Sequence, residues 1–355
     1  MTRKKTDRHE SDQWNSVRSV SSVGHHPNNY CCPQCKGGLG RLEGGYRCDS
    51  CARTYPVVLG IPDFRVFPDP YISYEDDYRK AQYLVEHARD LDFAGMLWLY
   101  WTITPQVSAD RAARFVRHAL ALAERGEAKL AELEAAGVSG RALLEVGCGT
   151  GGLLIAACRR YPQVIGVDIA FRWLAVTRRR LAEAGAEAPL VCACAEALPF
   201  PEGSFDLIVA EDVLDHVAGQ GEMLRECHRV ARRDGILYLT TPNRFSLARE
   251  PHVHVWGVGF WPRRWMDRYV RWARGIPYEF LRVLSFLELK RLLEDNSFPD
   301  HRISAPLVPE AKRFSAGERM LVAIYDLVRR TPVLRWGLYL VGPFFEVVGH
   351  ARKEE

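Results

Sequence analysis

The sequence predicts an α/β protein with a doubly wound, mostly parallel sheet, and three observations indicate it. Short apolar runs alternate with helical stretches from residue 142 onward. A glycine-rich loop follows the first apolar run, and an acidic residue ends the second. Parallel strands are usually continuous apolar segments, because helices cover both faces of such a sheet.

The strands and helices of this sheet can be assigned in chain order. The expected strands are ALLEV at 142–146, QVIGVD at 163–168, APLVCA at 188–193, FDLIVA at 205–210 and GILYLT at 235–240. The expected helices between them are LLIAACRR at 153–160, FRWLAVTRRRLAEA at 171–184 and GEMLRECHRVAR at 221–232. A later helix at 285–297 and a last apolar strand at 344–353 complete the domain.

The rest of the chain divides by composition. Polar residues without periodicity predict a disordered tail at 1–28. A short segment rich in Cys, Gly and Pro occupies 29–65, and a helical connector is expected at 66–137. The sheet domain then covers 138–355, with insertions at about 244–284 and about 309–341 that break the alternation of strands and helices.

Composition and charge exclude several classes of protein. With 48 basic and 44 acidic residues, the net charge of +4 is too small to indicate nucleic-acid binding from bulk charge. No apolar run approaches the ~20 residues of a spanning helix, and the N-terminus has no apolar signal region. Ten cysteines without a disulfide-scaffold pattern favour a reducing, cytoplasmic location.

Four cysteines form two CxxC pairs that predict a structural zinc site. Cys32 and Cys35 are separated by 12 residues from Cys48 and Cys51, with glycines between the pairs. Four thiolates at this spacing can surround one zinc ion tetrahedrally, whereas redox chemistry would need only one such pair at a helix start. Two segments around these pairs resemble small zinc-ribbon proteins that activate methyltransferases, namely CPQCKGGL and GYRCDSCARTYPVVLGIPDF. That resemblance implies that the segment at 29–65 supports a catalytic domain or binds substrate. The alternative is that the zinc only stabilises the fold of this short segment.

The glycine-rich loop reads LEVGCGTGG over 144–152, between a predicted strand and a predicted helix. Glycines there allow a sharp turn and a close approach of the backbone to a ligand, at the carboxyl edge of the sheet. Asp168 ends the next strand, where a carboxylate can accept hydrogen bonds from ribose hydroxyls. The site therefore suits a nucleoside cofactor.

The pattern E/DxGxGxG resembles the S-adenosylmethionine loop of class I methyltransferases, which implies a seven-stranded Rossmann-like sheet. By resemblance, Glu145 holds the methionine end, Asp168 the ribose and Ile169 the adenine. The family usually has Asp where this chain has Cys194, so the adenine contact is expected to shift to Ala195 or Glu196; Cys148 can also be only a small residue in a turn. The implied cofactor-binding set is Glu145, Gly147, Cys148, Gly149, Gly151, Asp168, Ile169, Cys194, Ala195, Glu196 and Glu211.

The segment EDVLDH at 211–216 follows the fourth strand at the mouth of the site. Its DxxDH pattern resembles the ExxEH of ubiquinone-pathway O-methyltransferases, which implies a divalent metal at Asp212, Asp215 and His216. Aspartate shortens both carboxylate arms, so acids near a helix N-terminus beside a pocket histidine are the alternative interpretation.

The insertion at 244–284 leaves the fifth strand beside this site and is expected to form a lid over the acceptor. His252 and His254 lie early in it and are candidates for the general base. Together with His216 they form the predicted catalytic set.

The same insertion carries an aromatic stripe and an excess of arginines. Trp261, Trp265, Tyr269 and Trp272 fall on one face of a predicted helix, and 244–282 holds eight Arg against three acidic residues. Three interpretations follow: packing into a core or lid, peripheral contact of 256–274 with anionic lipid, or stacking on RNA.

We therefore expect a cytoplasmic S-adenosylmethionine-dependent methyltransferase, with peripheral contact at the inner membrane face as an additional hypothesis. It would methylate a hydroxyl of a small molecule, a lipid-linked acceptor or a glycan. An RNA methyltransferase and a catalytically weak cofactor-binding regulator are the alternatives, with nucleic acid the less favoured partner. The oligomeric state is not indicated by the sequence.

Overall fold

The computed structural model describes residues 30–104, 107–307 and 316–353. The predicted tail at 1–28 and the start of the predicted insertion at 309–341 lie outside these residues. Within them, the main sheet has seven strands in the order β10-β11-β9-β8-β5-β6-β7. The strands are β5 (Ala142–Val146), β6 (Gln163–Asp168), β7 (Leu190–Cys192), β8 (Phe205–Glu211), β9 (Ala231–Pro242), β10 (His301–Ser304) and β11 (Phe344–Ala351).

The sheet is mostly parallel. β5 pairs in parallel with β6 on one side and with β8 on the other, and β8 continues in parallel to β9. Only β11 runs against its neighbours β9 and β10. The chain order therefore reverses direction between β5 and β8, which opens a crevice at the carboxyl ends of these two strands. The predicted fold class is confirmed.

Helices cover both faces of the sheet, because successive side chains of a buried strand point to opposite sides. Leu143 of β5 belongs to one core and Leu144 to the other. The core around Leu144 also includes residues of α6 (Gln220–Val230) and α8 (Phe286–Asp295). The opposite face carries α1 (Tyr74–His87), α2 (Phe93–Thr102), α3 (Ala109–Ala135), α4 (Gly152–Cys158) and α5 (Phe171–Glu183).

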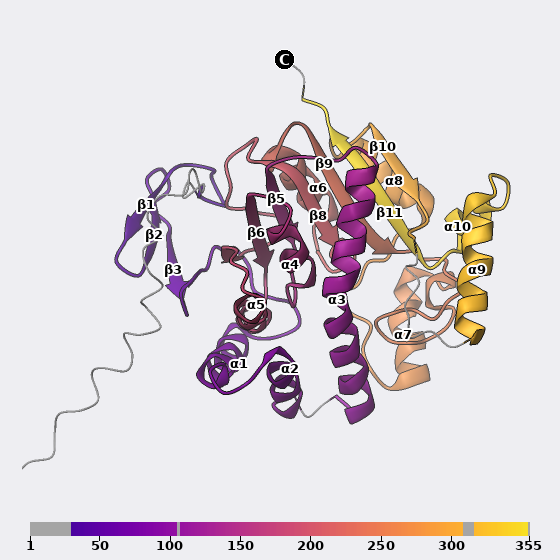
Figure 1. Ribbon diagram of the computed structural model, residues 1–355, viewed down its shortest axis with the longest axis horizontal. Coiled ribbons are helices and arrows are strands. Elements are labelled where there is room, and N and C mark those ends of the chain that lie inside the picture. The colour runs from indigo at the N-terminus through magenta and orange to yellow at the C-terminus, as the bar shows by residue number, and fades with distance from the viewer. Residues whose placement is uncertain (1–29, 105–106, 308–315, 354–355) are drawn as a thin grey trace, which may run out of the picture.

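The N-terminal segment forms a small antiparallel sheet of its own at the β7 edge of the main sheet (Figure 1). Backbone bonds hold it there: Phe64 N–H donates to the Cys192 carbonyl at 2.8 Å, and Cys31 N–H to the Pro199 carbonyl at 3.0 Å. A salt bridge of 2.6 Å joins Lys36 to Glu226 of α6. The small sheet contains β1 (Leu39–Leu42), β2 (Gly45–Cys48), β3 (Thr54–Val58) and β4 (Ile61–Pro62).

Two further parts of the chain gather at the other end of the molecule, beside the β9–β11 side of the sheet (Figure 1). The first contains η1 (Val258–Phe260) and α7 (Arg263–Arg274), and the second contains α9 (Ala316–Arg330) and α10 (Arg335–Val341). A backbone bond of 3.0 Å from Leu247 N–H to the Val341 carbonyl connects them.

The aromatic stripe of α7 does not pack into a core. The helix buries Met266 and Val270, while the Trp265 side chain is 45% exposed and that of Trp272 is 81% exposed. Rings of the stripe stack along the helix surface instead, with 6.5 Å between the centroids of Trp261 and Trp265. The tryptophans of the stripe therefore do not form a core, because Met266 and Val270 already supply the buried face and only Tyr269 packs against them.

Candidate active site

A cavity of about 560 Å³ opens at the carboxyl ends of β5, β6 and β8, where the strand order reverses. This is the position at which open α/β sheets bind ligands, and the volume suits a cofactor or small molecule. Six segments from distant parts of the chain form its wall. They lie at 67–71, 146–149, 167–173, 193–196, 212–218 and 280–282.

The glycine loop has a conformation that other residues would strain. Gly147, Gly149 and Gly151 have φ values of 71°, 49° and 71°, which is the left-handed region. A Cβ on Gly147 would also lie 2.2 Å from Cγ2 of Val213. The bare backbone at this point is the kind of surface that a nucleoside cofactor approaches closely.

Asp168 lies at the end of β6 on the cavity wall. Its two carboxylate oxygens accept backbone N–H bonds from Gly149 at 2.8 Å and Ala170 at 2.9 Å, which fix the side chain beside the loop. Burial nevertheless raises the pKa of Asp168 to about 6. The carboxylate keeps free lone pairs, so it can still accept bonds from ribose hydroxyls.

The structure brings part of the predicted cofactor set to the cavity. Of that set, the wall includes Gly147, Gly149, Asp168, Ile169, Ala195 and Glu196. The remaining five are not on the described wall, namely Glu145, Cys148, Gly151, Cys194 and Glu211.

These five residues support the wall or lie behind it. Glu145 is buried, and its Oε2 has no hydrogen-bond partner among the described residues. Burial also raises the pKa of Glu211, to about 7. The Cys194 thiol lies 3.4 Å from the Phe67 carbonyl, so it holds the segment that leaves the ribbon rather than facing the cavity. The turn formed by Cys148 and Gly151 is closed by a backbone bond of 2.7 Å between them.

Two predicted histidines meet beside the cavity. His216, on the wall, has its Nε2 3.0 Å from Nε2 of His252. The other ring nitrogen of His252 lies 2.5 Å from a carboxylate oxygen of Glu250. Oδ2 of the buried Asp215 is 3.2 Å from Nε2 of His252. The insertion therefore carries His252 to the end of β8, next to His216.

Tyr71 completes this cluster and was not identified from the sequence. Its hydroxyl lies 2.8 Å from Nδ1 of His216 and donates to the Phe280 carbonyl at 3.3 Å. Tyr71 follows the ribbon, about 145 positions before His216, and no local motif marks it. Only the docking of the ribbon beside the sheet brings the two residues together.

The electrostatics of the two imidazoles differ. Burial, followed by the neighbouring His252, lowers the pKa of His216 to about 4. Burial also disfavours charge on His252, but the hydrogen bond and charge of Glu250 outweigh it and raise the pKa of His252. A proton on this pair therefore resides on His252, leaving a neutral imidazole at the cavity wall.

His254 and Asp212 lie apart from the cluster. His254 has a φ of 55° and an exposed side chain; burial and then Arg114 and Arg111 of α3 lower its pKa. It is not on the described wall of the cavity. Asp212 is on the wall, with a φ of 54°, and accepts a bond of 3.1 Å from the Thr240 hydroxyl. Neither residue joins the histidines.

A group of potential metal ligands differs from the predicted one. Single ligand atoms of Asp215, His216 and His252 lie within 4.8 Å of one another, and Asp212 does not belong to this group. Both Asp215 oxygens lack a hydrogen bond to any described residue. The second nitrogen of each histidine is held, one by Glu250 and the other by Tyr71. Such outer contacts commonly orient metal-binding imidazoles.

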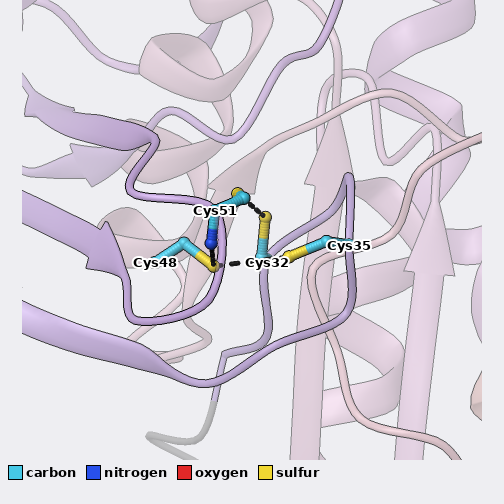
Figure 2. Close-up of side chains that lie close together, drawn as sticks. All are labelled: Cys32, Cys35, Cys48 and Cys51. Carbon is cyan, nitrogen blue, oxygen red and sulfur yellow. Dashed lines mark hydrogen bonds between the residues drawn. The ribbon is translucent and has the colours of Figure 1, made fainter.

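The four cysteines of the two CxxC pairs converge in the ribbon (Figure 2). The sulfur atoms of Cys32 and Cys51 are 3.7 Å apart, and those of Cys35 and Cys48 are 3.4 Å apart. Zinc–sulfur bonds of about 2.3 Å in a tetrahedron require sulfur separations of about 3.8 Å. The Tyr55 hydroxyl lies 3.1 Å from the Cys32 sulfur and can support a thiolate there.

Residues 144–239 match a family described as a methyltransferase domain. The chain is 26% identical over 197 residues to the ubiquinone biosynthesis O-methyltransferase of Idiomarina loihiensis, covering 55% of this chain and 77% of that protein. It is 35% identical over 112 residues to the protein of that name from Pseudomonas paraeruginosa, covering 31% of this chain and 48% of that one. YcgJ of Bacillus subtilis aligns with a TM-score of 0.41 and 19% identity, over 65% of this chain and 100% of that one.

The sheet and the glycine loop agree with the match of residues 144–239 to a methyltransferase domain, and together they support an S-adenosylmethionine-dependent methyltransferase. The chain spans about half the length of the Pseudomonas relative. The domain match begins at residue 144, so it does not include the ribbon.

Proposed function

We propose that this protein transfers a methyl group from S-adenosylmethionine to a hydroxyl of a small-molecule, lipid-linked or glycan acceptor. The proposal rests mainly on the contact between His216 and His252, which Glu250 and Tyr71 hold beside the cavity. Hydroxyl methylation needs a proton acceptor near the attacking oxygen, and a pair of imidazoles backed by a carboxylate can supply one.

The position that we propose for the cofactor rests on the residues that line the cavity. A side chain at Gly147 would collide with Val213 and one at Gly151 with Thr177, so the loop remains bare backbone, and Asp168 offers a fixed acceptor for the ribose. Ala195 and Glu196 line the same cavity and would border the adenine. When bound, S-adenosylmethionine supplies an activated methyl group that is open to in-line attack.

The chain's own residues would then orient the acceptor and take its proton. With the pair in its unprotonated state, the acceptor hydroxyl would bond to an Nε2 atom in place of the contact between the two imidazoles, and its proton would come to rest on His252, whose charge Glu250 stabilises. Tyr71 fixes the His216 ring from the opposite nitrogen. Phe280 and Leu281 form an apolar side of the cavity that excludes water from the reacting atoms.

The test is a product analysis with the full chain. S-adenosylmethionine labelled in its methyl group is incubated with a panel of phenols, lipid-linked phenols and free sugars, and methyl ethers and S-adenosylhomocysteine are measured by mass spectrometry. We expect label on an acceptor oxygen. Label found only on nitrogen, on carbon or on added RNA would contradict the proposal.

A specific observation favours a second chemistry at the same place, a divalent metal held by Asp215, His216 and His252. The metal would polarise the acceptor hydroxyl in place of a base. Metal analysis can distinguish this site from the four-cysteine site. His252→Ala would remove the metal held by Asp215, His216 and His252 and leave the metal held by the cysteines. Unchanged metal content in that variant would contradict the second chemistry.

We also propose that the ribbon binds one structural zinc ion through Cys32, Cys35, Cys48 and Cys51. Segment 67–71 leaves the ribbon and forms one wall of the cavity, so the ion would stabilise that wall as well as the ribbon. Elemental analysis of protein never exposed to chelator is expected to show one zinc that is lost in Cys48→Ser. A content far below one per chain would contradict it.

A further inference from the structure

A large apolar surface lies at the end of the molecule formed by α7, α9 and α10, and it is called the end surface here. Its exposed apolar residues are Leu247, Trp256, Phe260, Trp261, Trp265, Trp272, Met320, Leu321, Ile324, Leu327, Val333, Leu334, Trp336 and Leu340. We propose that the end surface docks the protein onto an anionic phospholipid bilayer.

The α7 part of the end surface is a ridge of stacked rings. Trp261 and Trp265 are stacked with 6.5 Å between centroids, and Tyr269 and Trp272 with 6.1 Å. Aromatic side chains of this kind favour the boundary between lipid headgroups and acyl chains, because one end is apolar and the other polar.

The second part comes from α9 and α10, which pack against each other. Met320, Ile324 and Leu327 recur at the spacing of one helical face, and the Leu327 side chain is 65% exposed. Trp336 and Leu340 extend this face along α10. A water-soluble helix normally turns such a face inward, so its exposure indicates a partner.

Hydrogen bonds make the two parts continuous. The Tyr269 hydroxyl donates to the Trp256 carbonyl at 2.9 Å, and the Trp256 indole donates to the Leu247 carbonyl at 3.0 Å. Leu247 N–H then donates to the Val341 carbonyl of α10 at 3.0 Å. Figure 1 shows α7, α9 and α10 grouped at one end of the molecule, away from the ribbon.

Charge selects the kind of partner. The 244–284 insertion holds eight Arg and three acidic residues, so its net charge of +5 exceeds the net charge of +4 of the whole chain. Arg264 and Arg268 are exposed and have no salt bridge to a described residue. Arg268 lies about 40° around the helix from Trp272, so its guanidinium borders the aromatic ridge. Apolar rings beside free arginines match acyl chains beneath anionic headgroups.

A second copy of the chain fits this surface less well. A symmetric contact would bring the same arginine-rich insertion of both copies together, and like charges in close contact are destabilising. No described helix is both long and apolar enough to cross a bilayer, so the contact we propose is peripheral.

The end surface is linked to the cavity by a short piece of chain. After α7 ends at Arg274, residues 275–282 lead directly to Phe280, Leu281 and Arg282 on the cavity wall. An acceptor with an apolar tail could therefore reach the cavity from the bilayer. The docking itself does not depend on the proposed function, since binding to vesicles needs neither cofactor nor acceptor.

Vesicle co-sedimentation of the full chain tests the proposal. One vesicle contains phosphatidylcholine alone, and the other contains phosphatidylcholine and phosphatidylglycerol in equal parts. We expect strong binding to the anionic vesicle only. Three double variants should each weaken it by roughly tenfold or more: Trp265→Ala with Trp272→Ala, Ile324→Ser with Leu327→Ser, and Arg264→Glu with Arg268→Glu.

Matched controls lie outside the end surface. Trp98 of α2 is as exposed as Trp265, at 45%, and Arg41 of β1 is exposed without a salt bridge to a described residue. Trp98→Ala and Arg41→Glu should bind anionic vesicles like the unaltered protein. Absence of binding to either vesicle would overturn the proposal, as would equal losses in the controls. Self-association that needs Trp265 and Leu327, without vesicle binding, would identify a second copy as the partner instead.

Discussion

The two sides of the cavity are built in different ways. The proposed cofactor side comes mainly from one stretch, in which β5, the glycine loop and β6 follow one another within 30 residues of sequence, with Ala195 and Glu196 added from beyond β7. The acceptor side combines Tyr71 from the segment after the ribbon, His216 from the end of β8 and His252 from the insertion. A local motif thus specifies the first side, whereas the second exists only after distant segments have packed.

The largest effect should come from the acceptor side. His252→Ala removes the imidazole on which the hydroxyl proton would come to rest, so turnover should fall by about 10²- to 10⁴-fold. S-adenosylmethionine affinity, measured by calorimetry, should stay nearly unchanged. His254→Ala is the matched control, because His254 lies in the same segment but outside the described cavity wall. Equal losses in both variants would show that the segment acts through its fold alone.

On the cofactor side, Asp168→Ala should weaken S-adenosylmethionine binding at least tenfold. Hydrogen bonds to a charged group contribute about 1.5–3 kcal/mol each. Because Asp168 also accepts bonds from Gly149 and Ala170, Asp168→Asn is a second variant that retains the side-chain shape. Thermal unfolding of both variants checks the loop. Unchanged affinity in both would place the ribose elsewhere.

The pH dependence of cofactor affinity is a weaker but separate test of the same carboxylate. The pKa of Asp168 is raised to about 6, and the ionised form is the better acceptor for ribose hydroxyls. Affinity should therefore be constant well above pH 6 and fall by up to about tenfold per pH unit below it. Calorimetry from about pH 8 to about pH 5 measures this, and Asp168→Asn should remove the dependence on the acid side.

The smallest effect should come from Tyr71→Phe. Loss of the hydroxyl bond to His216 loosens the imidazole but leaves the proton acceptor in place, so turnover should fall roughly three- to tenfold. Tyr83→Phe on the exposed part of α1 provides the control. A loss as large as that of His252→Ala would mean that Tyr71 itself takes part in the proton transfer.

Features of the site that depend on local sequence could be predicted, whereas features that depend on packing between distant segments could not. The pattern at 144–152 predicted a sharp turn beside a ligand site, since turn geometry depends on neighbouring residues alone, and three of its glycines have left-handed φ values. The metal hypothesis at Asp212, Asp215 and His216 could not be refined from spacing, because Asp212 stays outside the group of neighbouring ligand atoms while His252 enters it. The aromatic stripe was visible in the sequence, but not whether neighbouring elements would cover it.

The sequence by itself determined the alternation of strands and helices, the glycine loop, Asp168 and the pairing of the four cysteines into one cluster. These features depend on periodicity and on contacts between residues close in the chain. Tertiary structure alone decided that Tyr71 supports His216, that His254 stays outside the described cavity wall and that the α7 ridge faces outward. Each of these depends on how separate segments pack, and packing is set by complementary surfaces that lie far apart in the sequence.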